Sequence, residues 1–142
     1  MRKSALDLLA RREHSTQELR RKLASRNFEP ELVESTVTAL VSEGLLDNAR
    51  FAESFVHSRY QRGQGPQKIR SELRERGVDD GLIAECLDDT SLHWSERVEQ
   101  VRKKRFGPKP PTDFRERSRQ MRFLLQRGFT SEQIQGVFSR SG

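Results

Sequence analysis

The chain carries one sequence pattern three times, and this internal repeat limits its fold more than any other feature. Residues 15–33 (STQELRRKLASRNFEPELV) align without a gap with residues 65–83 (GPQKIRSELRERGVDDGLI). A third, fainter copy covers residues 121–134 (MRFLLQRGFTSEQI). A repeat of this length predicts stacked helical units.

Each copy has the pattern of two helices joined by a tight turn. Apolar residues spaced i, i+4, such as Leu19 and Leu23, form one stripe of a helix. Asn27, Gly77 and Gly128 occupy equivalent positions after this stripe, and these residue types tolerate the left-handed backbone just past a helix C-terminus. The next residue is apolar in all three copies, and we expect it to fold back onto the helix that it leaves.

Capping residues mark the starts of several predicted helices. Ser15 with Glu18, and Thr130 with Gln133, have capping-box spacing, and Asp47 is an expected N-cap. No stretch shows the period-two alternation of a strand. The predicted helices cover residues 5–12, 15–26, 30–43, 48–60, 66–76, 80–88, 94–106, 114–127 and 131–139.

The apolar content decides how these helices are grouped. Hydrophobic residues make up 32% of the chain, which is below the ~45–50% of an average soluble domain. Several small cores in a row are therefore expected in place of one large core. We predict an all-α, elongated protein of three tandem three-helix repeats, with domains at residues 1–46, 47–90 and 91–142.

The third copy differs from the others in its apolar stripe. Gln120 stands where the other copies have Leu19 and Ile69. We expect Met121, Leu124 and Leu125 to form the buried face of that helix instead.

Positive charge gathers in the last third of the chain. Residues 91–142 hold 12 Lys and Arg against 5 Asp and Glu, while the net charge of the whole chain is +6. Arginine outnumbers lysine 21 to 6, which favours bidentate contact with phosphate or carboxylate groups. The basic residues lie on the middle helix of each repeat and on the seventh helix, so we expect a basic binding protein.

The sequence contains none of the motifs that would indicate catalysis or cofactor binding. There is no P-loop, no dinucleotide fingerprint and no His-Glu-x-x-His zinc motif. His14, His57 and His93 are scattered without metal-ligand spacing, and we expect the first two to be solvated. Cys86 is expected to be a small buried apolar residue. We therefore assign no catalytic, cofactor-binding or metal-binding residue, and predict that the protein is not an enzyme.

The sequence favours neither a membrane protein nor a protein that binds a specific DNA operator. The apolar run at the N-terminus is short and interrupted by Asp7, so we expect a soluble, cytoplasmic protein with no membrane contact. Three short helices per repeat are typical of helix-turn-helix DNA readers, but the last helix is acidic in the first two repeats, and phosphates would repel it. Most aromatic residues, including Tyr60 and Trp94, have core periodicity, which argues against strong single-strand affinity.

Four segments, in order along the chain, resemble the successive signatures of the RecX family, bacterial regulators of the RecA recombinase. They are ALDLLARREHSTQELRRKL from residue 5, EGLLDNARFAESFV from residue 43, GPQKIRSELRERGV from residue 65 and RFLLQRGF from residue 122. One departure is Asn48, where the family usually has a second aspartate after Asp47. We expect little consequence, because Asp47 can still cap the helix.

The resemblance implies a more specific function than composition and periodicity alone indicate. RecX-like proteins bind the RecA–DNA filament along its groove, suppress its ATPase and strand exchange, and promote disassembly, in the setting of recombination, DNA repair and the SOS response. We expect a monomer that binds single-stranded or duplex DNA weakly and without sequence specificity. The alternatives are a sequence-nonspecific DNA-binding helical-repeat protein and a structural helical adaptor. The residues expected to contact the filament or DNA are Arg20, Arg21, Lys22, Lys68, Arg70, Arg74, Arg76, Lys103, Lys104, Arg105, Arg119 and Arg122.

Overall fold

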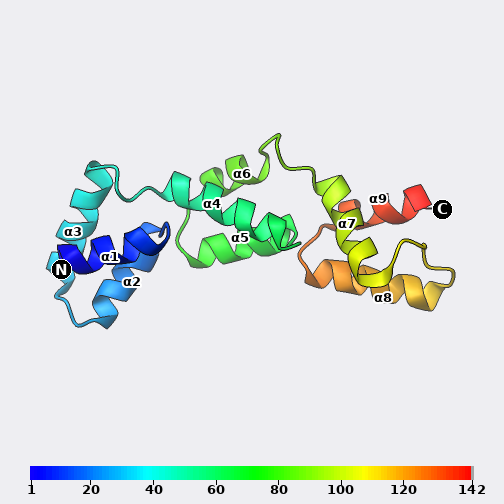
Figure 1. Ribbon diagram of the computed structural model, residues 1–142, viewed down its shortest axis with the longest axis horizontal. Coiled ribbons are helices and arrows are strands. Elements are labelled where there is room, and N and C mark those ends of the chain that lie inside the picture. The colour runs from blue at the N-terminus through cyan, green and yellow to red at the C-terminus, as the bar shows by residue number, and fades with distance from the viewer. Residues whose placement is uncertain (142) are drawn as a thin grey trace. The chain divides into compact units, whose positions relative to one another are not determined.

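The computed structural model describes residues 1–141, and over this range the secondary structure consists of nine α-helices without a strand (Figure 1). The predicted all-α fold is therefore confirmed. None of the helices in this range is both long and apolar enough to cross a lipid bilayer. The helices are α1 (Arg2–Arg11), α2 (Thr16–Ser25), α3 (Pro30–Ser42), α4 (Asn48–Gln61), α5 (Pro66–Glu75), α6 (Asp80–Leu87), α7 (Trp94–Phe106), α8 (Phe114–Gln126) and α9 (Ser131–Ser141).

Local capping explains where α2, α4 and α9 begin. The Glu18 N–H donates to Ser15 Oγ at 3.1 Å and the Ser15 N–H donates to Glu18 Oε1 at 3.1 Å, which is the predicted capping box of α2. Thr130 and Gln133 form the same reciprocal pair before α9. Asp47 caps α4 by accepting from two N–H groups of its first turn. These short-range signals were predicted correctly because each depends on three or four consecutive residues.

The turns after the middle helices have the predicted left-handed backbone. The φ angle is 65° at Asn27, 77° at Gly77 and 103° at Gly128. In the second repeat the Val78 N–H donates to the Leu73 carbonyl at 3.1 Å, so the chain folds back onto the helix that it leaves. The equivalent bond forms in the third repeat.

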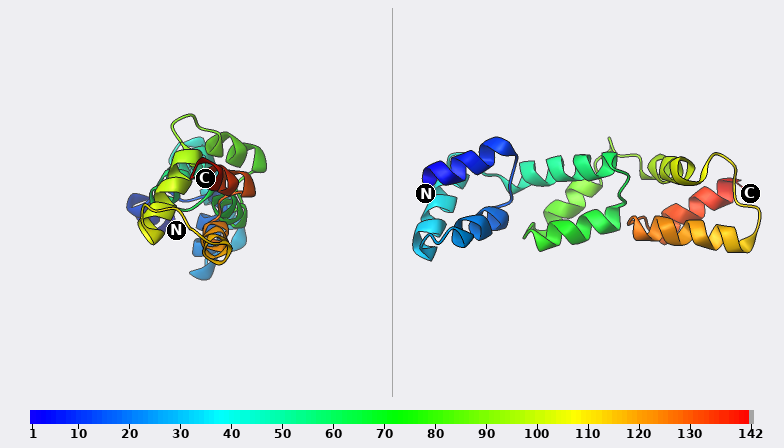
Figure 2. Two further views of the ribbon diagram at one scale, coloured as in Figure 1. Left: turned by 90° about the vertical axis from the view of Figure 1, so that its right-hand side faces the viewer. Right: turned by 60° about the horizontal axis from the view of Figure 1, so that its bottom comes forward.

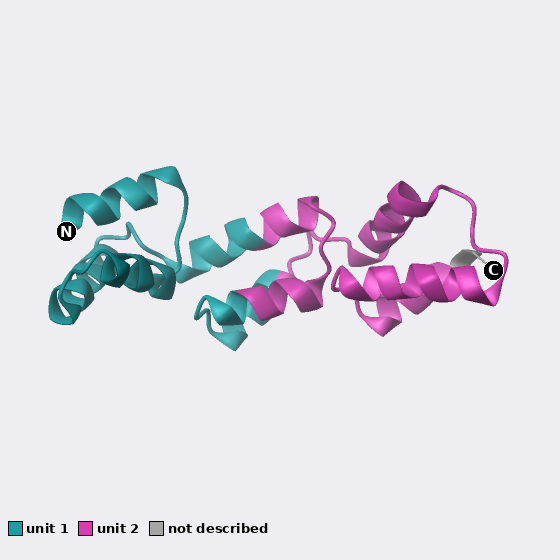
Figure 3. Cartoon of the chain, turned by 90° about the horizontal axis from the view of Figure 1, so that it is seen from below, with its two compact units in different colours: residues 1–55, 73–86 teal, residues 56–72, 87–142 magenta. Residues whose placement is uncertain are grey.

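The chain divides into two compact units that differ from the predicted repeats. Unit 1 comprises residues 1–55 and 73–86, and unit 2 comprises residues 56–72 and 87–142 (Figure 3). The divisions fall inside α4 and α5 and before the last residue of α6, so each unit contains part of the middle repeat.

Each unit has its own apolar core. In unit 1, α2 packs on α1 and α3 (Figure 2). In unit 2, helices α7, α8 and α9 all pack against one another. One core cluster of unit 1 consists of Ala5, Leu8, Leu19, Leu23, Val33, Val37, Leu40 and Leu46. The unit 2 core contains Val98, Val101, Leu124, Phe129, Ile134, Val137 and Phe138.

The buried face of α8 differs from the prediction. Leu124 is fully buried and Met121 packs partly buried against the core, but Leu125 is 50% exposed. Gln120, expected to be outside the apolar face, is 3% exposed and occupies the buried position. The prediction was wrong because it required an apolar side chain at a position that a polar network fills.

That network centres on a buried arginine. Arg102 is only 1% exposed, and its Nη1 donates to Gln120 Oε1 and to the Lys109 carbonyl, both at 3.4 Å. Gln120 Nε2 donates in turn to Glu116 Oε1 at 3.2 Å. Gln120 is therefore kept polar because it supplies an acceptor to a buried guanidinium.

Both units contain the same joint between the start of one middle helix and the end of the next. In unit 1, Ser15 Oγ donates to the Arg76 carbonyl at 2.8 Å. In unit 2, the N–H of Gly65, which aligns with Ser15, donates to the Arg127 carbonyl at 2.7 Å. The Gln67 N–H also donates to the Gly128 carbonyl at 2.9 Å, so this joint contains two backbone–backbone hydrogen bonds.

The close approach at the joints explains why two of the three turn residues are glycine. A Cβ atom on Gly77 would overlap the side chain of Gln17, and one on Gly128 would lie 2.8 Å from the backbone nitrogen of Lys68. The equivalent residue of the first repeat is Asn27, which is exposed. All three positions need a residue that tolerates positive φ, but Gly77 and Gly128 must also lack a side chain.

The unit 2 joint can be tested with Gly65→Ala. A Cβ atom at residue 65 would overlap the backbone of Gly128 and Phe129, although φ at this position is not positive. We expect a loss of ~1–3 kcal/mol in the free energy of unfolding, the usual range for overpacking. Chemical denaturation followed by circular dichroism measures it.

Gly136→Ala is the matched control within α9. No atom lies within 4 Å of the new Cβ, so alanine should stabilise the helix by up to about 1 kcal/mol. Equal stability of Gly65→Ala and the wild type would contradict the close backbone contact.

Candidate functional site

The predicted contact residues of unit 1 bond mainly within the protein. Arg21 Nη1 donates to the Glu75 carbonyl at 3.2 Å. Three others form ion pairs, and any external anion must compete with their carboxylates. These pairs join Arg20 to Glu34 at 2.6 Å, Arg74 to Asp80 at 2.8 Å and Arg76 to Glu18 at 3.5 Å.

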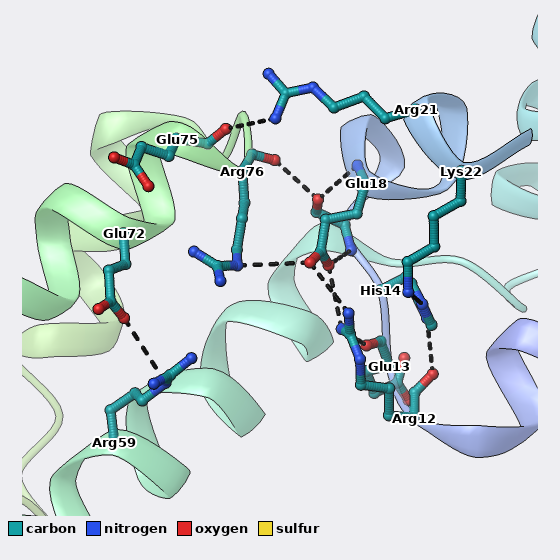
Figure 4. Close-up of polar contacts among 11 residues, drawn as sticks. Arg12, Glu13, His14, Glu18, Arg21, Lys22, Arg59, Glu72, Glu75 and Arg76 are labelled. Carbon is teal, nitrogen blue, oxygen red and sulfur yellow. Dashed lines mark hydrogen bonds and ion pairs between the residues drawn. The ribbon is translucent and has the colours of Figure 1, made fainter. Parts of the chain in front are cut away.

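Glu18 is the centre of this unit 1 network (Figure 4). Its carboxylate lies 3.2 Å from Arg12 Nη2 and 3.5 Å from Arg76 Nε. Burial alone would raise the pKa of Glu18, but hydrogen bonds from Arg12 and the Ser15 N–H outweigh it and hold the pKa below the ordinary value of 4.5. The ionised carboxylate therefore ties the start of α2 to the end of α5.

His14 is buried, so the expectation of a solvated histidine was wrong. It is 1% exposed, with Nδ1 3.0 Å from the Arg12 carbonyl and Nε2 2.9 Å from Lys22 Nζ. A neutral imidazole satisfies both partners by donating from Nδ1 and accepting at Nε2. Burial lowers the pKa of His14, the bond to the Arg12 carbonyl opposes this, and the charges of Arg12 and Lys22 lower it further. Lys22 thus points into the fold.

Asn48 has a role in unit 1 that the sequence did not indicate. Its Oδ1 accepts from the Thr16 N–H at 2.9 Å, and its Nδ2 lies 3.3 Å from Thr16 Oγ1. Asn48 therefore joins the start of α4 to the start of α2. An aspartate could accept from the N–H but could not donate to the hydroxyl.

The predicted residues of unit 2 fall into two groups. Lys68 is exposed, Arg70 is half-buried with only a 3.5 Å contact to Gln67, and Lys103 pairs with Glu99 at 3.3 Å. None of these three residues lines the two concavities that the remaining predicted residues border. The other group, Lys104, Arg105, Arg119 and Arg122, lines two adjacent concavities on α7 and α8.

We call the lining of these two concavities the basic–aromatic surface. The first concavity has a volume of about 320 Å³ and the second about 260 Å³, and both are bordered by Arg105 and Phe123. The basic and aromatic residues of the surface are Arg62, Arg97, Lys104, Arg105, Phe106, Arg119, Arg122, Phe123 and Arg127.

Three of these cations were not among the predicted contact residues. Arg97 on α7 donates from Nε to the Tyr60 carbonyl at 3.0 Å and from Nη2 to the Gln61 carbonyl at 2.8 Å. Arg127, just after α8, donates from Nη2 to the Arg62 carbonyl at 2.9 Å. The end of α4 therefore brings Arg62, Arg97 and Arg127 together. No short-range sequence signal could have shown this convergence.

Two phenylalanines form the aromatic part of the surface. The rings of Phe106 and Phe123 meet edge to face, with centroids 5.3 Å apart. The Arg105 guanidinium carbon lies 5.7 Å from the Phe106 centroid and 5.6 Å from the Phe123 centroid. Arg119 lies over Phe106 at 5.0 Å and Arg127 over Phe123 at 5.8 Å. The expectation that most phenylalanines lie in the core was wrong for these half-buried rings, and for Phe114, which is 83% exposed.

The charge of the basic–aromatic surface is unbalanced. Neither concavity is lined by an aspartate or glutamate. Of its seven cations, only Arg119 has a carboxylate partner within the described range, namely Glu116 at 2.7 Å. Unpaired guanidinium groups around a concavity concentrate positive potential and attract polyanions.

Within the described residues, no three His, Cys, Asp or Glu side chains are grouped to hold a metal ion.

The fold and this surface define an all-helical repeat protein that presents an arginine-rich face. Three family models match the chain in order. The models of the first, second and third three-helix domains of RecX match residues 2–40, 47–87 and 95–138. The chain belongs to the RecX family.

Curated relatives and solved structures agree with this assignment. The regulatory protein RecX of Halorhodospira halophila is 52% identical over 137 residues, covering 96% of this chain and 85% of the relative. That of Pseudomonas syringae pv. tomato is 43% identical and covers 100% of this chain and 92% of the relative. The crystal structure of RecX from Lactobacillus salivarius has a TM-score of 0.82 at 20% identity, covering 99% of this chain and 93% of that one, and shows the shared fold.

His14 should make the stability of unit 1 depend on pH. Its pKa is lowered from 6.5 in the folded state, so the unfolded chain binds more protons as pH falls through 6.5, and stability is lost on acidification. His14→Gln keeps a donor and an acceptor but does not titrate. We expect the variant to lose less stability between pH 7.5 and 5.5, a range that lies above the titration of Glu18.

Urea unfolding at the two pH values measures this difference, which cannot exceed ~1.4 kcal/mol per pH unit for one proton. His57→Gln is the control, because His57 is exposed on α4. An unchanged pH dependence in His14→Gln would contradict a neutral buried imidazole.

Proposed function

We propose that this protein binds the RecA–DNA filament, lowers its ATPase and strand-exchange activity, and promotes its disassembly. The observation that carries the proposal is the match of all three RecX three-helix domains, in order, along the chain. The protein acts stoichiometrically as a monomer in the cytoplasm, where the filament assembles, and turns over no substrate.

The physical basis of inhibition is binding energy. A regulator shifts the filament between states only to the extent that it binds one state more tightly than the other. A protein that contacts several filament subunits and the enclosed DNA stabilises the filament conformation to which it binds. ATP hydrolysis and strand exchange slow if that conformation disfavours either step.

The basic–aromatic surface is the contact that the structure supports best. Lys104, Arg105 and Arg122 are exposed and have no ion pair in the described part of the chain. Arg119 and the convergent Arg62, Arg97 and Arg127 join them. The other predicted contacts remain part of the proposal, but several must first leave an internal partner, as Arg20 must leave Glu34.

A sequence-nonspecific DNA-binding protein is the second candidate. The observation that favours it is the unbalanced charge of the same surface, which would attract phosphates without RecA. The two candidate functions differ in their expected effect on RecA activity. Only the first predicts an effect on RecA at protein concentrations well below those that coat the DNA.

The test is RecA ATPase on single-stranded DNA against rising concentration of this protein. We expect hydrolysis to fall at or below one molecule per RecA subunit. The triple substitution Lys104→Gln, Arg105→Gln, Arg122→Gln should raise the half-inhibitory concentration about 10- to 100-fold, since three exposed charge contacts at ~0.5–1 kcal/mol each are lost.

Arg115→Gln is the control, because Arg115 is exposed on α8 but borders neither concavity. Unchanged ATPase and strand exchange at saturating wild-type protein would reject the proposed function. Full inhibition by the triple variant would reject only the assignment to this surface.

A further inference from the structure

We propose that the first concavity of the basic–aromatic surface binds single-stranded nucleic acid, with an unpaired base against Phe123 and the flanking phosphates on arginine side chains. The weak single-strand binding expected from the sequence thereby gains a position on the protein and a stacking residue, and it does not require RecA. It differs from the sequence-based expectation that the core periodicity of most aromatic residues argues against strong single-strand affinity.

The charge of the concavity indicates a ligand with more than one anionic group. Five cations line it: Arg62, Arg97, Lys104, Arg105 and Arg127. None of the five forms an ion pair with any described carboxylate. Their charge is therefore available to successive phosphates of one strand.

Two of these arginines are held in place without being neutralised. Arg97 donates three of its five N–H groups in hydrogen bonds to the Tyr60 and Gln61 carbonyls and to the Gln100 side chain. Arg127 is fixed by the Arg62 carbonyl. Carbonyl oxygens orient a guanidinium but leave its formal charge. The remaining Nη N–H groups can therefore meet phosphate oxygens at little ordering cost, whereas Nε of Arg127 is buried.

The aromatic ring distinguishes a nucleotide from an acidic peptide. Carboxylates need only the cations, whereas Phe123, half-buried between the two concavities, offers a flat apolar face. Guanidinium groups lie over that face in the free protein, an interaction worth ~0.5–1 kcal/mol at exposed sites. A stacked base contributes ~1–3 kcal/mol. A base therefore displaces the exposed Arg105, and its guanidinium becomes free to contact a phosphate.

The same geometry favours an unpaired strand over a duplex. In a duplex the base faces are stacked on one another and cannot reach a ring inside a concavity. The second concavity shares Arg105 and Phe123 with the first and adds Phe106, Arg119 and Arg122. A neighbouring nucleotide can therefore occupy it along one continuous strand.

The experiment measures binding of a fluorescent oligothymidylate of ~15 nucleotides by anisotropy, with no RecA present. Phe123→Leu keeps an apolar side chain but removes the ring, and we expect a 5- to 100-fold weaker affinity. Phe114→Leu is the matched control, since Phe114 is 83% exposed on α8 and borders neither concavity. Arg105→Gln should reduce the salt slope by about one phosphate contact.

Three outcomes would overturn the proposal. The first is wild-type affinity in Phe123→Leu, with thermal unfolding confirming that the variant folds. The second is equal affinity for a duplex of the same length. The third is displacement of the oligonucleotide by polyglutamate of equal charge as effectively as by unlabelled oligonucleotide, which would assign the concavity to an acidic peptide. RecA ATPase inhibition can succeed or fail independently of all three, so the two proposals are separable.

Discussion

The contact between the start of one middle helix and the end of the next is the constraint on which the described structure depends. With 32% hydrophobic residues, a single three-helix repeat buries too little apolar surface to be stable alone. The backbone bonds from Gly65 to Arg127 and from Gln67 to Gly128 join parts of two repeats in unit 2. Ser15 and Arg76 do so in unit 1. The compact units therefore form around the joints between repeats.

The two units use similar arginines for different purposes. In unit 1, the guanidinium groups of Arg12 and Arg76 converge on Glu18 and strengthen the joint. In unit 2, the joint consists of backbone bonds, and no carboxylate lines the nearby concavities. Six of the seven cations of the basic–aromatic surface therefore have no carboxylate partner among the described residues, and their charge can act on a partner. Repeats of one helical pattern can in this way divide stability and binding between them, because a charge that pairs internally contributes little to an external contact.

Buried polar groups mark the places where the repeats differ. His14 and the Arg102–Gln120 pair occupy interior positions that a uniform apolar repeat would fill with aliphatic side chains. His14 is bonded at both ring nitrogens, and Gln120 bonds to Arg102 and Glu116. Arg102 bonds through Nη1, while its Nε is buried without a hydrogen-bond partner, which costs free energy. These networks hold α1 against α2 and α7 against α8.

The sequence by itself determined the nine helices of the described range, the caps at Ser15, Asp47 and Thr130, and the left-handed turns at Asn27, Gly77 and Gly128, because each depends on residues close together in the chain. It also determined the family, through signatures spread along the chain. Only the tertiary structure decided that His14 is buried and that Arg62 and Arg127 border one concavity with Phe123. Those contacts join residues up to 65 positions apart, and neither helical periodicity nor capping specifies which side chains meet across such a separation.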